Sequence, residues 1–280
     1  MISPRRASLI VALVLGTLLS LAPPASTDSP RLALSSSGQG EPTIVLIHGA
    51  GQDRHLWDRV TPLLESRHRV VRVDLPGHGE SPPVTPFSLQ AVASALDRTL
   101  DREKIKKAVL VGHSYGAFVA LEEAAAHPSR ASAIVPIDLP SYIVADSERI
   151  GNLEGLLRNR YPVFVAGVFQ QMTRDSSQID SVVAKAERVP REVLSAYFRE
   201  SWTMDLRPRI KKLKQPIMVV LTDQTWSDAE SWSSARARLG YETAGPAIGR
   251  RIYFSGHLIP LDQPDSLAAA ILDFAATLRR

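Results

Sequence analysis

The sequence contains no cysteine, and this absence removes several kinds of chemistry at once. Disulfides, thiolate metal sites, a cysteine nucleophile and lipid attachment through cysteine are all excluded. Aromatic residues are few, 6% of the 280 positions, and neither sign of charge dominates. The formal charge is +4, from 33 basic and 29 acidic residues, and no basic run is long enough to follow a nucleic-acid backbone. We therefore expect no nucleic-acid partner.

Motifs for metal and nucleotide binding are missing as well. The sequence has no His-Glu-x-x-His, no His-x-His-x-Asp cluster and no glycine-rich phosphate loop. We therefore expect no metal and no cofactor, and a small molecule as the partner. The 44% hydrophobic content excludes disorder as the main state and suffices for one large α/β domain.

The one long hydrophobic run lies at the start of the chain. Arg5 and Arg6 precede an apolar run over residues 7–22, and small residues and prolines follow over residues 23–26. This order is typical of a secretory signal peptide, and the run is shorter than the ~20 residues that span a bilayer. We predict a signal peptide over residues 1–26 and a secreted or periplasmic protein without stable membrane association. An uncleaved membrane anchor is the alternative.

After residue 26, short apolar runs rich in β-branched residues alternate with longer segments of helical spacing. This alternation predicts an α/β fold, a mostly parallel sheet with helices on both faces. The predicted strands cover residues 43–47, 69–74, 108–111, 133–137, 217–221 and 252–254. The predicted helices around them cover residues 56–64, 87–100, 115–126 and 266–278.

The alternation stops over residues 140–212, a segment that we call the insertion. It contains four helix-like stretches and no convincing strand; they cover residues 148–157, 163–172, 179–189 and 192–202. We predict a helical lid over the carboxyl edge of the sheet. The core would then consist of residues 27–139 and 213–280.

The pentapeptide Gly112-His113-Ser114-Tyr115-Gly116 lies between a predicted strand and a predicted helix. In that context the pattern Gly-x-Ser-x-Gly predicts a nucleophile elbow, a turn so sharp that the serine is strained. The serine hydroxyl would lie at the helix N-terminus, where the helix dipole favours negative charge. Ser114 is therefore the predicted nucleophile. The alternative is a tight turn in which the serine is only an N-cap.

A serine hydroxyl needs a base within hydrogen-bond reach before it can attack a carbonyl. Of the seven histidines, only His257 follows a late strand and precedes the last helix, where a loop can bring it over Ser114. His257 is the predicted base. We expect the side chain of His113 to face elsewhere, because His113 precedes the serine directly.

The first predicted strand ends in His48-Gly49-Ala50-Gly51. A backbone amide there can point at the reacting carbonyl oxygen, together with the amide that follows the nucleophile. We predict that the amides of Ala50 and Tyr115 form the oxyanion hole. Of the aromatic residues in the insertion, we expect Trp202 and Phe169 to line the substrate pocket; the alternative is that they form the insertion's own core.

Four motifs together carry a resemblance to a known superfamily. They are Ile44-Val45-Leu46-Ile47-His48-Gly49, Asp74-Leu75-Pro76-Gly77-His78-Gly79-Glu80-Ser81, the elbow, and Gly256-His257. Their order resembles that of the α/β-hydrolase superfamily, in its lidded, esterase-like branch, over roughly residues 31–139 and 213–280. The resemblance implies an α/β-hydrolase fold and a cofactor-free hydrolase with Ser114, His257 and an acid as its triad.

The acid is where this sequence departs from that superfamily. In most members the acid follows the penultimate strand, and that position falls on Thr225, which cannot orient an imidazolium by charge. Asp138 ends an earlier strand and matches the place where some members, the haloalkane dehalogenases among them, carry the acid. Asp223 would need a shorter turn, and Asp228 fits the N-cap of a helix. We predict Asp138, with Asp223 and then Asp228 as alternatives.

These residues predict an exported serine hydrolase that cleaves a small, largely apolar ester through an acyl-enzyme. Lactone, thioester, amide and carbon–carbon bond hydrolysis remain open. Dehalogenase and epoxide hydrolase activities are disfavoured because both need a carboxylate where Ser114 stands. The alternative from another class is a ligand-binding protein on the same fold, since Thr225 occupies the usual position of the acid.

Overall fold

A computed structural model of the protein describes residues 31–278. The predicted signal peptide over residues 1–26 lies outside this range. Within residues 31–278, no helix is both long and apolar enough to cross a bilayer.

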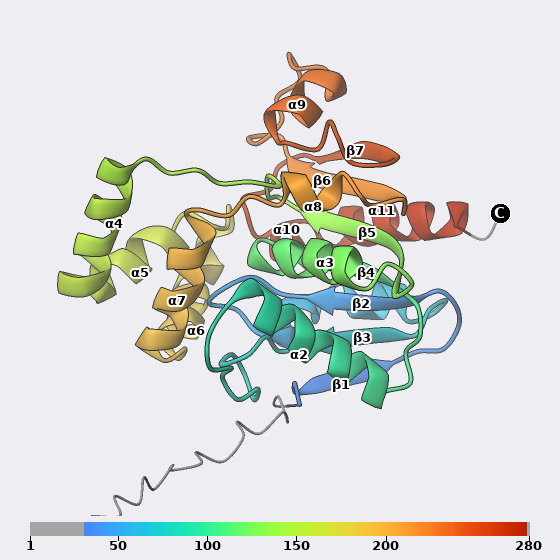
Figure 1. Ribbon diagram of the computed structural model, residues 1–280, viewed down its shortest axis with the longest axis horizontal. Coiled ribbons are helices and arrows are strands. Elements are labelled where there is room, and N and C mark those ends of the chain that lie inside the picture. The colour runs from blue at the N-terminus through green and yellow to red at the C-terminus, as the bar shows by residue number, and fades with distance from the viewer. Residues whose placement is uncertain (1–30, 279–280) are drawn as a thin grey trace, which may run out of the picture.

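A seven-stranded sheet in the order β1-β3-β2-β4-β5-β6-β7 forms the centre of the molecule (Figure 1). Strand β1 runs antiparallel to β3, and every other neighbouring pair is parallel. The mostly parallel α/β sheet predicted from the sequence is therefore confirmed. The strands are β1 Leu34–Ser37, β2 Thr43–Ile47, β3 Val70–Val73, β4 Ala108–His113, β5 Ala131–Ile137, β6 Ile217–Thr222 and β7 Ala247–Ile252.

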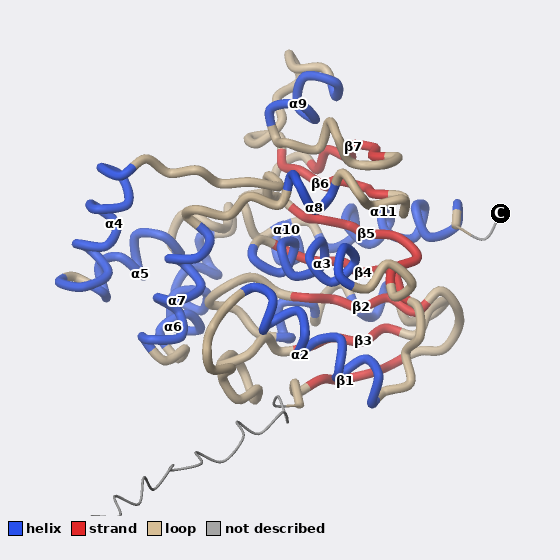
Figure 2. The backbone as a smooth tube through the Cα atoms, in the orientation of Figure 1, coloured by secondary structure: helices blue, strands red, loops and turns tan. Residues whose placement is uncertain are grey.

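Helices cover both faces of this sheet. In Figure 2 the red strands form a layer between blue helices. One face packs against α2 Leu89–Arg102, α3 Tyr115–Ala126, α8 Arg207–Ile210 and α9 Trp232–Arg238. The other face packs against the 3₁₀ turn η1 Arg54–Trp57, α1 Thr61–Leu64, α10 Ile259–Asp262 and α11 Pro264–Thr277.

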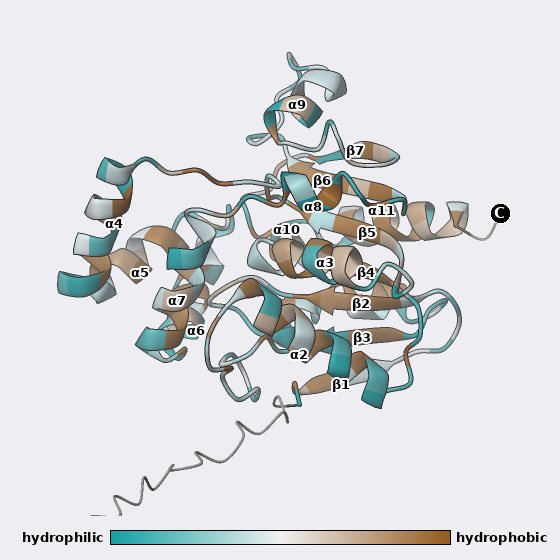
Figure 3. Ribbon diagram, viewed as in Figure 1, coloured by the Kyte–Doolittle hydropathy of each residue, from teal (hydrophilic) through white to brown (hydrophobic). Residues whose placement is uncertain are grey.

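The central strands are apolar on both sides because both sides are covered. All five residues of β2 are buried; Val45 and Ile47 belong to one core cluster, and Ile44 and Leu46 to the other. Figure 3 shows the hydrophobic colour concentrated in these strands. The continuous apolar run that predicted β2 is thus explained by two hydrophobic cores, one on each face of the sheet.

Three elements depart clearly from the sequence prediction. The last strand spans Ala247–Ile252 and not residues 252–254. It lies at the edge of the sheet, where exposed and half-buried residues alternate and mask the apolar pattern. Strand β1 was not predicted, since three of its four residues are serines. The predicted helix over residues 56–64 is a 3₁₀ turn and a short helix, with Pro62 at the start of the latter.

The insertion leaves the sheet after β5 and returns before β6. Four of its α-helices, all before residue 202, gather at one end of the sheet in Figure 1, whereas the fifth, α8, packs against the sheet face that α2 and α3 cover. An isolated bridge between Tyr142 and Asp205 pairs the two ends of the insertion. The four helices at that end are α4 Ser147–Asn159, α5 Tyr161–Phe169, α6 Ile179–Glu187 and α7 Arg191–Ser201, with a 3₁₀ turn η2 at Ser176–Gln178.

Candidate active site

Ser114 occupies the turn between β4 and α3 in a strained conformation, with φ +51° and ψ −125°. Its N–H donates to the carbonyl of Ile137 at 3.0 Å, which fixes the turn against β5. A Cβ on Gly116 would lie 2.4 Å from the carbonyl oxygen of Ile47, so only glycine fits there. A strained residue directly after a buried central strand, at the start of a helix, is the geometry of a nucleophile elbow.

A cavity of about 300 Å³ opens beside Ser114. Helices of the insertion supply much of its wall, with Arg149 and Leu153 from α4, Phe164 and Val168 from α5, and Tyr197, Phe198 and Ser201 from α7. The other lining residues are Ala50, Ser114, Tyr115, Phe118, Leu139, Ile143, Ala145, Trp202 and His257.

Of the two aromatic residues predicted for this pocket, Trp202 lines the cavity and Phe169 does not. Phe169 is fully buried, and its ring packs against Phe198 with 6.2 Å between centroids. A Cβ on Gly51 would lie 2.2 Å from the Phe169 ring, so this ring fills the space behind the wall. Phe169 therefore belongs to the core of the insertion, which corrects its predicted place.

His257 lies in the loop between β7 and α10 and lines the same cavity as Ser114. Its Nδ1 is 2.8 Å from Oδ2 of Asp138, so the imidazole donates Nδ1–H to this carboxylate. That bond directs the other ring nitrogen, Nε2, away from the acid. The histidine and the first of the three predicted acids are thus brought together across 119 residues.

Asp138 directly follows β5 and has a positive φ of +49°. The N–H of Thr222 donates to its Oδ1 at 3.1 Å. Burial acts to raise the pKa of Asp138, but the hydrogen bond and charge of His257, with further bonds from Thr225 and Thr222, hold this pKa below its ordinary value. Asp138 is therefore a carboxylate near neutral pH. Thr225, at the usual position of the acid, contributes a hydroxyl to it.

The two alternative acids have other partners. Asp223 pairs with Arg174 at 3.3 Å. Asp228 accepts from Tyr253 at 2.7 Å and also contacts Arg251. Neither carboxylate contacts His257, so the structure brings only Asp138 of the three to the imidazole.

The loop that carries Ala50 runs close to the nucleophile. A Cβ on Gly49 would lie 2.8 Å from the Cβ of Ser114. Neither the Ala50 N–H nor the Tyr115 N–H donates to an acceptor within residues 31–278. Two unsatisfied amides beside a nucleophile are the donors that an oxyanion hole requires.

Two buried histidines hold this loop to the segment after β3. The Nε2 of His48 accepts from the Leu75 N–H at 2.9 Å, and the Nε2 of His78 accepts from the Gly51 N–H at 3.0 Å. Burial lowers the pKa of His48 to about 4 and that of His78 to about 3. Both rings are neutral near pH 7, which leaves Nε2 free to accept.

His113 has a place that sequence reasoning missed. Its Nε2 donates to the backbone carbonyl of His257 at 2.8 Å, and the two rings lie 4.7 Å apart between centroids. Burial lowers the pKa of His113 to about 3, so this ring is also neutral. His113 does not line the cavity of Ser114, but its side chain supports the loop that carries the predicted base, a role that the sequence analysis did not assign. No signal in the sequence indicates this contact.

Glu200 ties the insertion to the elbow, and the sequence analysis did not single it out. Its Oε2 accepts from the Tyr115 hydroxyl, and its Oε1 accepts from the Leu89 N–H at 2.6 Å. The Tyr115 ring also packs against Tyr197 of α7, with 4.5 Å between centroids. The residue after the nucleophile is thereby held by a helix of the insertion.

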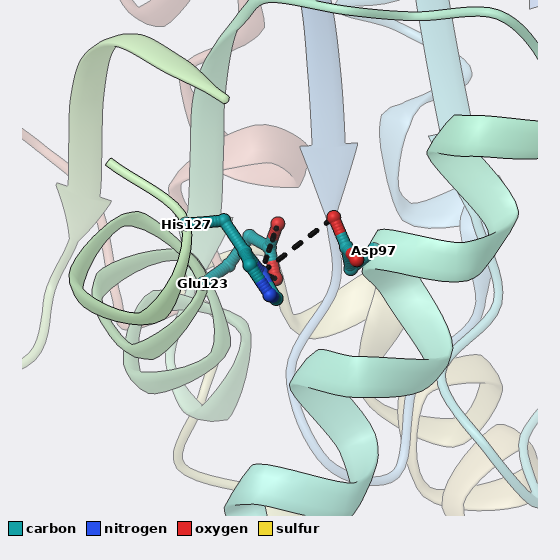
Figure 4. A group of neighbouring side chains, drawn as sticks. All are labelled: Asp97, Glu123 and His127. Carbon is teal, nitrogen blue, oxygen red and sulfur yellow. Dashed lines mark hydrogen bonds and ion pairs between the residues drawn. The ribbon is translucent and has the colours of Figure 1, made fainter. Parts of the chain in front are cut away.

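One group of side chains has the composition of a metal site. Asp97 on α2, Glu123 on α3 and His127, which directly follows α3, point toward one another in Figure 4. Arg130 already supplies positive charge there, with a guanidinium nitrogen 2.7 Å from the Asp97 carboxylate. The group lies away from the cavity of Ser114, and its side chains form a network of hydrogen bonds and an ion pair with one another and with Arg130.

The mostly parallel sheet, the strained serine and the hydrogen-bonded His257–Asp138 pair define a serine hydrolase. The chain belongs to the alpha/beta hydrolase family, whose match covers residues 44–270.

Known proteins agree with this assignment. A pimeloyl-[acyl-carrier protein] methyl ester esterase from Methylococcus capsulatus is 43% identical over 103 residues, which are 37% of this chain and 39% of that protein. One from Edwardsiella ictaluri is 26% identical over 254 residues, 85% of this chain and 95% of that protein. The structure of a thermophilic esterase from Thermogutta terrifontis matches with a TM-score of 0.77 at 23% identity, covering 92% of this chain and 97% of that one. The last similarity concerns the fold.

Proposed function

We propose that this protein hydrolyses a small carboxylic ester through an acyl-enzyme on Ser114. The observation that carries the proposal is the 2.8 Å bond between His257 and Asp138, beside the cavity that also holds the strained serine. The relatives from Methylococcus capsulatus and Edwardsiella ictaluri are methyl ester esterases, which supports an ester as the substrate. The mainly apolar wall of the cavity supports a largely apolar acyl or alkyl group.

In the first step, Ser114 Oγ forms a bond to the carbonyl carbon while Nε2 of His257 takes the hydroxyl proton. The carbonyl oxygen becomes an oxyanion held by the amides of Ala50 and Tyr115. When the tetrahedral species collapses, the bond to the alcohol oxygen breaks and His257 gives its proton to the departing alcohol. Asp138 keeps the imidazole in the required tautomer and stabilises its protonated form.

In the second step, water attacks the acyl carbon, and His257 takes one of its protons. The bond between Ser114 Oγ and the acyl carbon then breaks, and the serine recovers the proton from His257. The products are a carboxylic acid and an alcohol, and no cofactor takes part in either step of this scheme.

The direct test is turnover of 4-nitrophenyl butanoate by the wild-type protein, Ser114→Ala and Ser233→Ala. Ser233 is an exposed serine on α9 and serves as the matched control. We expect Ser114→Ala to lose about 10³-fold or more in kcat and Ser233→Ala to keep the wild-type rate. Binding without any turnover by the wild-type protein would favour the ligand-binding alternative.

Secretion remains a prediction from the sequence of residues 1–26. Expression of the full chain in a secreting host, followed by N-terminal sequencing of the exported protein, tests it. An N-terminus near residue 26 is expected. A protein that keeps its full mass and remains with the cells would contradict export.

A further inference from the structure

The cavity beside Ser114 has few polar groups in its wall, so the partner of each one matters. Apart from the proposed nucleophile and base, three hydroxyls line it, and each already donates to another residue. They are Tyr115, which donates to Glu200; Tyr197, which donates to the carbonyl of Pro76 at 2.9 Å; and Ser201, which donates to the carbonyl of Phe198 at 2.7 Å. None of these hydroxyl protons is available to a ligand.

Arg149 is the exception. Among residues 31–278 it is the one arginine or lysine that lines the cavity, and no aspartate or glutamate lines the cavity with it. Its backbone N–H is bonded to Asp146 at 2.7 Å, which caps α4, but its guanidinium has no acceptor in the described part of the chain. Arg149 is also exposed to solvent, so it lies at the rim of the cavity.

Of the three arginines and lysines that line the neighbouring cavity, Arg54 and Lys185 are paired with carboxylates, and the third, Arg188, is exposed. That cavity, of about 650 Å³, lies between the loops after β2 and β3 and helices α6 and α7. There Arg54 contacts Asp74 and Lys185 contacts Asp53 at 3.0 Å. Its cations are largely matched by anions of the protein, whereas Arg149 faces an apolar cavity with its charge unmatched.

We propose that the ester cleaved at Ser114 carries a carboxylate at the far end of an apolar segment, and that Arg149 binds this carboxylate. The proposal rests on the proposed function, since it names the substrate class of the same site. A guanidinium presents paired N–H donors that match the two oxygens of a carboxylate. An apolar segment between the ester and the carboxylate would lie along the hydrophobic wall. The substrate class is thus half-esters of small dicarboxylic acids, or esters of similar layout.

Binding tests this without any need for turnover. In Ser114→Ala protein, calorimetry compares monomethyl succinate, adipate and suberate with neutral methyl esters that have the same number of acyl carbons. At the best length, we expect the charged ester to bind about 10-fold or more tightly than its neutral counterpart. Adding Arg149→Gln should remove that preference and leave the neutral ester unchanged within about twofold.

The control is Arg158→Gln, which removes one positive charge from the same helix at an exposed position outside the cavity wall. It should leave the preference intact. Equal binding of charged and neutral esters at all three lengths would overturn the proposal. The proposal would also be overturned if the Arg158 and Arg149 variants lost the preference for the charged ester equally. That result would indicate that the preference comes from the overall positive charge of the helix and not from a carboxylate site at Arg149.

Kinetics separate this proposal from the proposed function. If the wild-type protein cleaves 4-nitrophenyl hexanoate and mono-4-nitrophenyl adipate at equal rates, and Arg149→Gln leaves the ratio of the two rates unchanged, the carboxylate site is refuted. That result leaves the esterase function in place. If the wild-type protein cleaves neither ester but the Ser114→Ala protein still binds the half-ester through Arg149, the esterase function is refuted. The carboxylate site is retained in that case.

Discussion

At the level of single residues, the proposed mechanism depends on how Asp138 holds His257. The carboxylate reaches the imidazole from the end of β5, and the Thr222 N–H and the Thr225 hydroxyl stabilise its ionised form. In most members of the superfamily, the position of Thr225 would supply the acid itself. Here a hydroxyl at that position supports an acid that comes from the neighbouring strand.

Asp138→Asn should lower kcat by up to about 10⁴-fold, because an amide can hold the imidazole in the wrong tautomer and cannot stabilise its positive charge. Steady-state turnover of 4-nitrophenyl butanoate measures the effect. Asp223→Asn is the matched control and should keep a rate near wild type, since Asp223 pairs with Arg174. A larger loss in the Asp223 variant than in the Asp138 variant would reverse the assignment.

The sequence could predict Ser114 and His257 because short-range patterns report them: a glycine-flanked turn and a histidine after a late strand. The acid could only be ranked among three aspartates, since the choice depends on which strand end lies nearest to His257 in space. His113 was beyond sequence reasoning. Its contact with the carbonyl of His257 joins residues 144 apart, and nothing near either residue encodes it.

At the level of secondary-structure elements, the insertion helices form the cavity wall and also hold the elbow. Glu200 on α7 accepts from the Tyr115 hydroxyl and from the N–H of Leu89 at the start of α2. The Tyr115 amide is one of the two proposed oxyanion donors. The position of α7 is therefore connected to the geometry of that donor through one carboxylate.

Glu200→Ala should lower kcat about 10-fold with little change in KM, since a displaced oxyanion donor acts mainly on the transition state. Glu200→Gln should recover most of the rate, because its amide oxygen can accept from Leu89 while its NH₂ group donates to the Tyr115 oxygen. Glu154→Ala, which breaks an exposed ion pair with Arg199 in the same insertion, is the control and should not change kcat. A loss of thermal stability in Glu200→Ala without any change in kcat would limit Glu200 to a structural role.

Element boundaries followed the sequence where one physical signal dominated. Helix α3 spans Tyr115–Ala126 as predicted, because the elbow fixes its start and an alanine-rich run continues it. Helix α2 begins at Leu89, close to the predicted start at residue 87, because Ser88 caps it by accepting from the Ala91 N–H. Strand β7 was displaced in the prediction because its exposed and half-buried residues alternate, as is typical of an edge strand, and do not follow the buried pattern of the centre. Likewise, the serine-rich β1 exists only through its pairing with β3.

At the level of the whole molecule, buried titratable groups of opposite effect set the dependence of stability on pH. Burial lowers the pKa of His48 to about 4 and the pKa values of His78 and His113 to about 3, from 6.5 in each case. These rings stay neutral in the folded protein but gain protons on unfolding once the pH falls below about 6.5. The stability they provide is complete above that pH and is lost as the pH falls.

Glu123, which lies beside Asp97 and His127 in Figure 4, changes the stability of the fold in the opposite direction with pH. Burial and the neighbouring Asp97 carboxylate raise its pKa from 4.5 to about 9. The folded protein then keeps a proton that the unfolded chain releases, so this contribution to stability is complete below about pH 4.5 and is lost as the pH rises through 9.

Together these shifts predict a stability maximum between about pH 6.5 and 7. Near pH 5, unfolding lets the three histidines take up nearly two more protons than Glu123 releases. The free energy of unfolding therefore falls by about 3 kcal/mol for each pH unit toward acid. Thermal unfolding between pH 5 and pH 9 measures the profile. Glu123→Gln should abolish the decline on the alkaline side and raise Tm at pH 8, by about 2–4 °C for each kcal/mol gained. A wild-type Tm that rises steadily from pH 7 to pH 9 would contradict this account.

The central claim is that one hydroxyl, that of Ser114, forms a covalent bond to the substrate. Mass spectrometry of the protein after reaction with a fluorophosphonate tests it most directly. We expect one phosphonyl group per chain, on the peptide that contains Ser114, and no adduct in Ser114→Ala. An adduct on another residue, or ester turnover that continues at the wild-type rate in Ser114→Ala, would contradict the account.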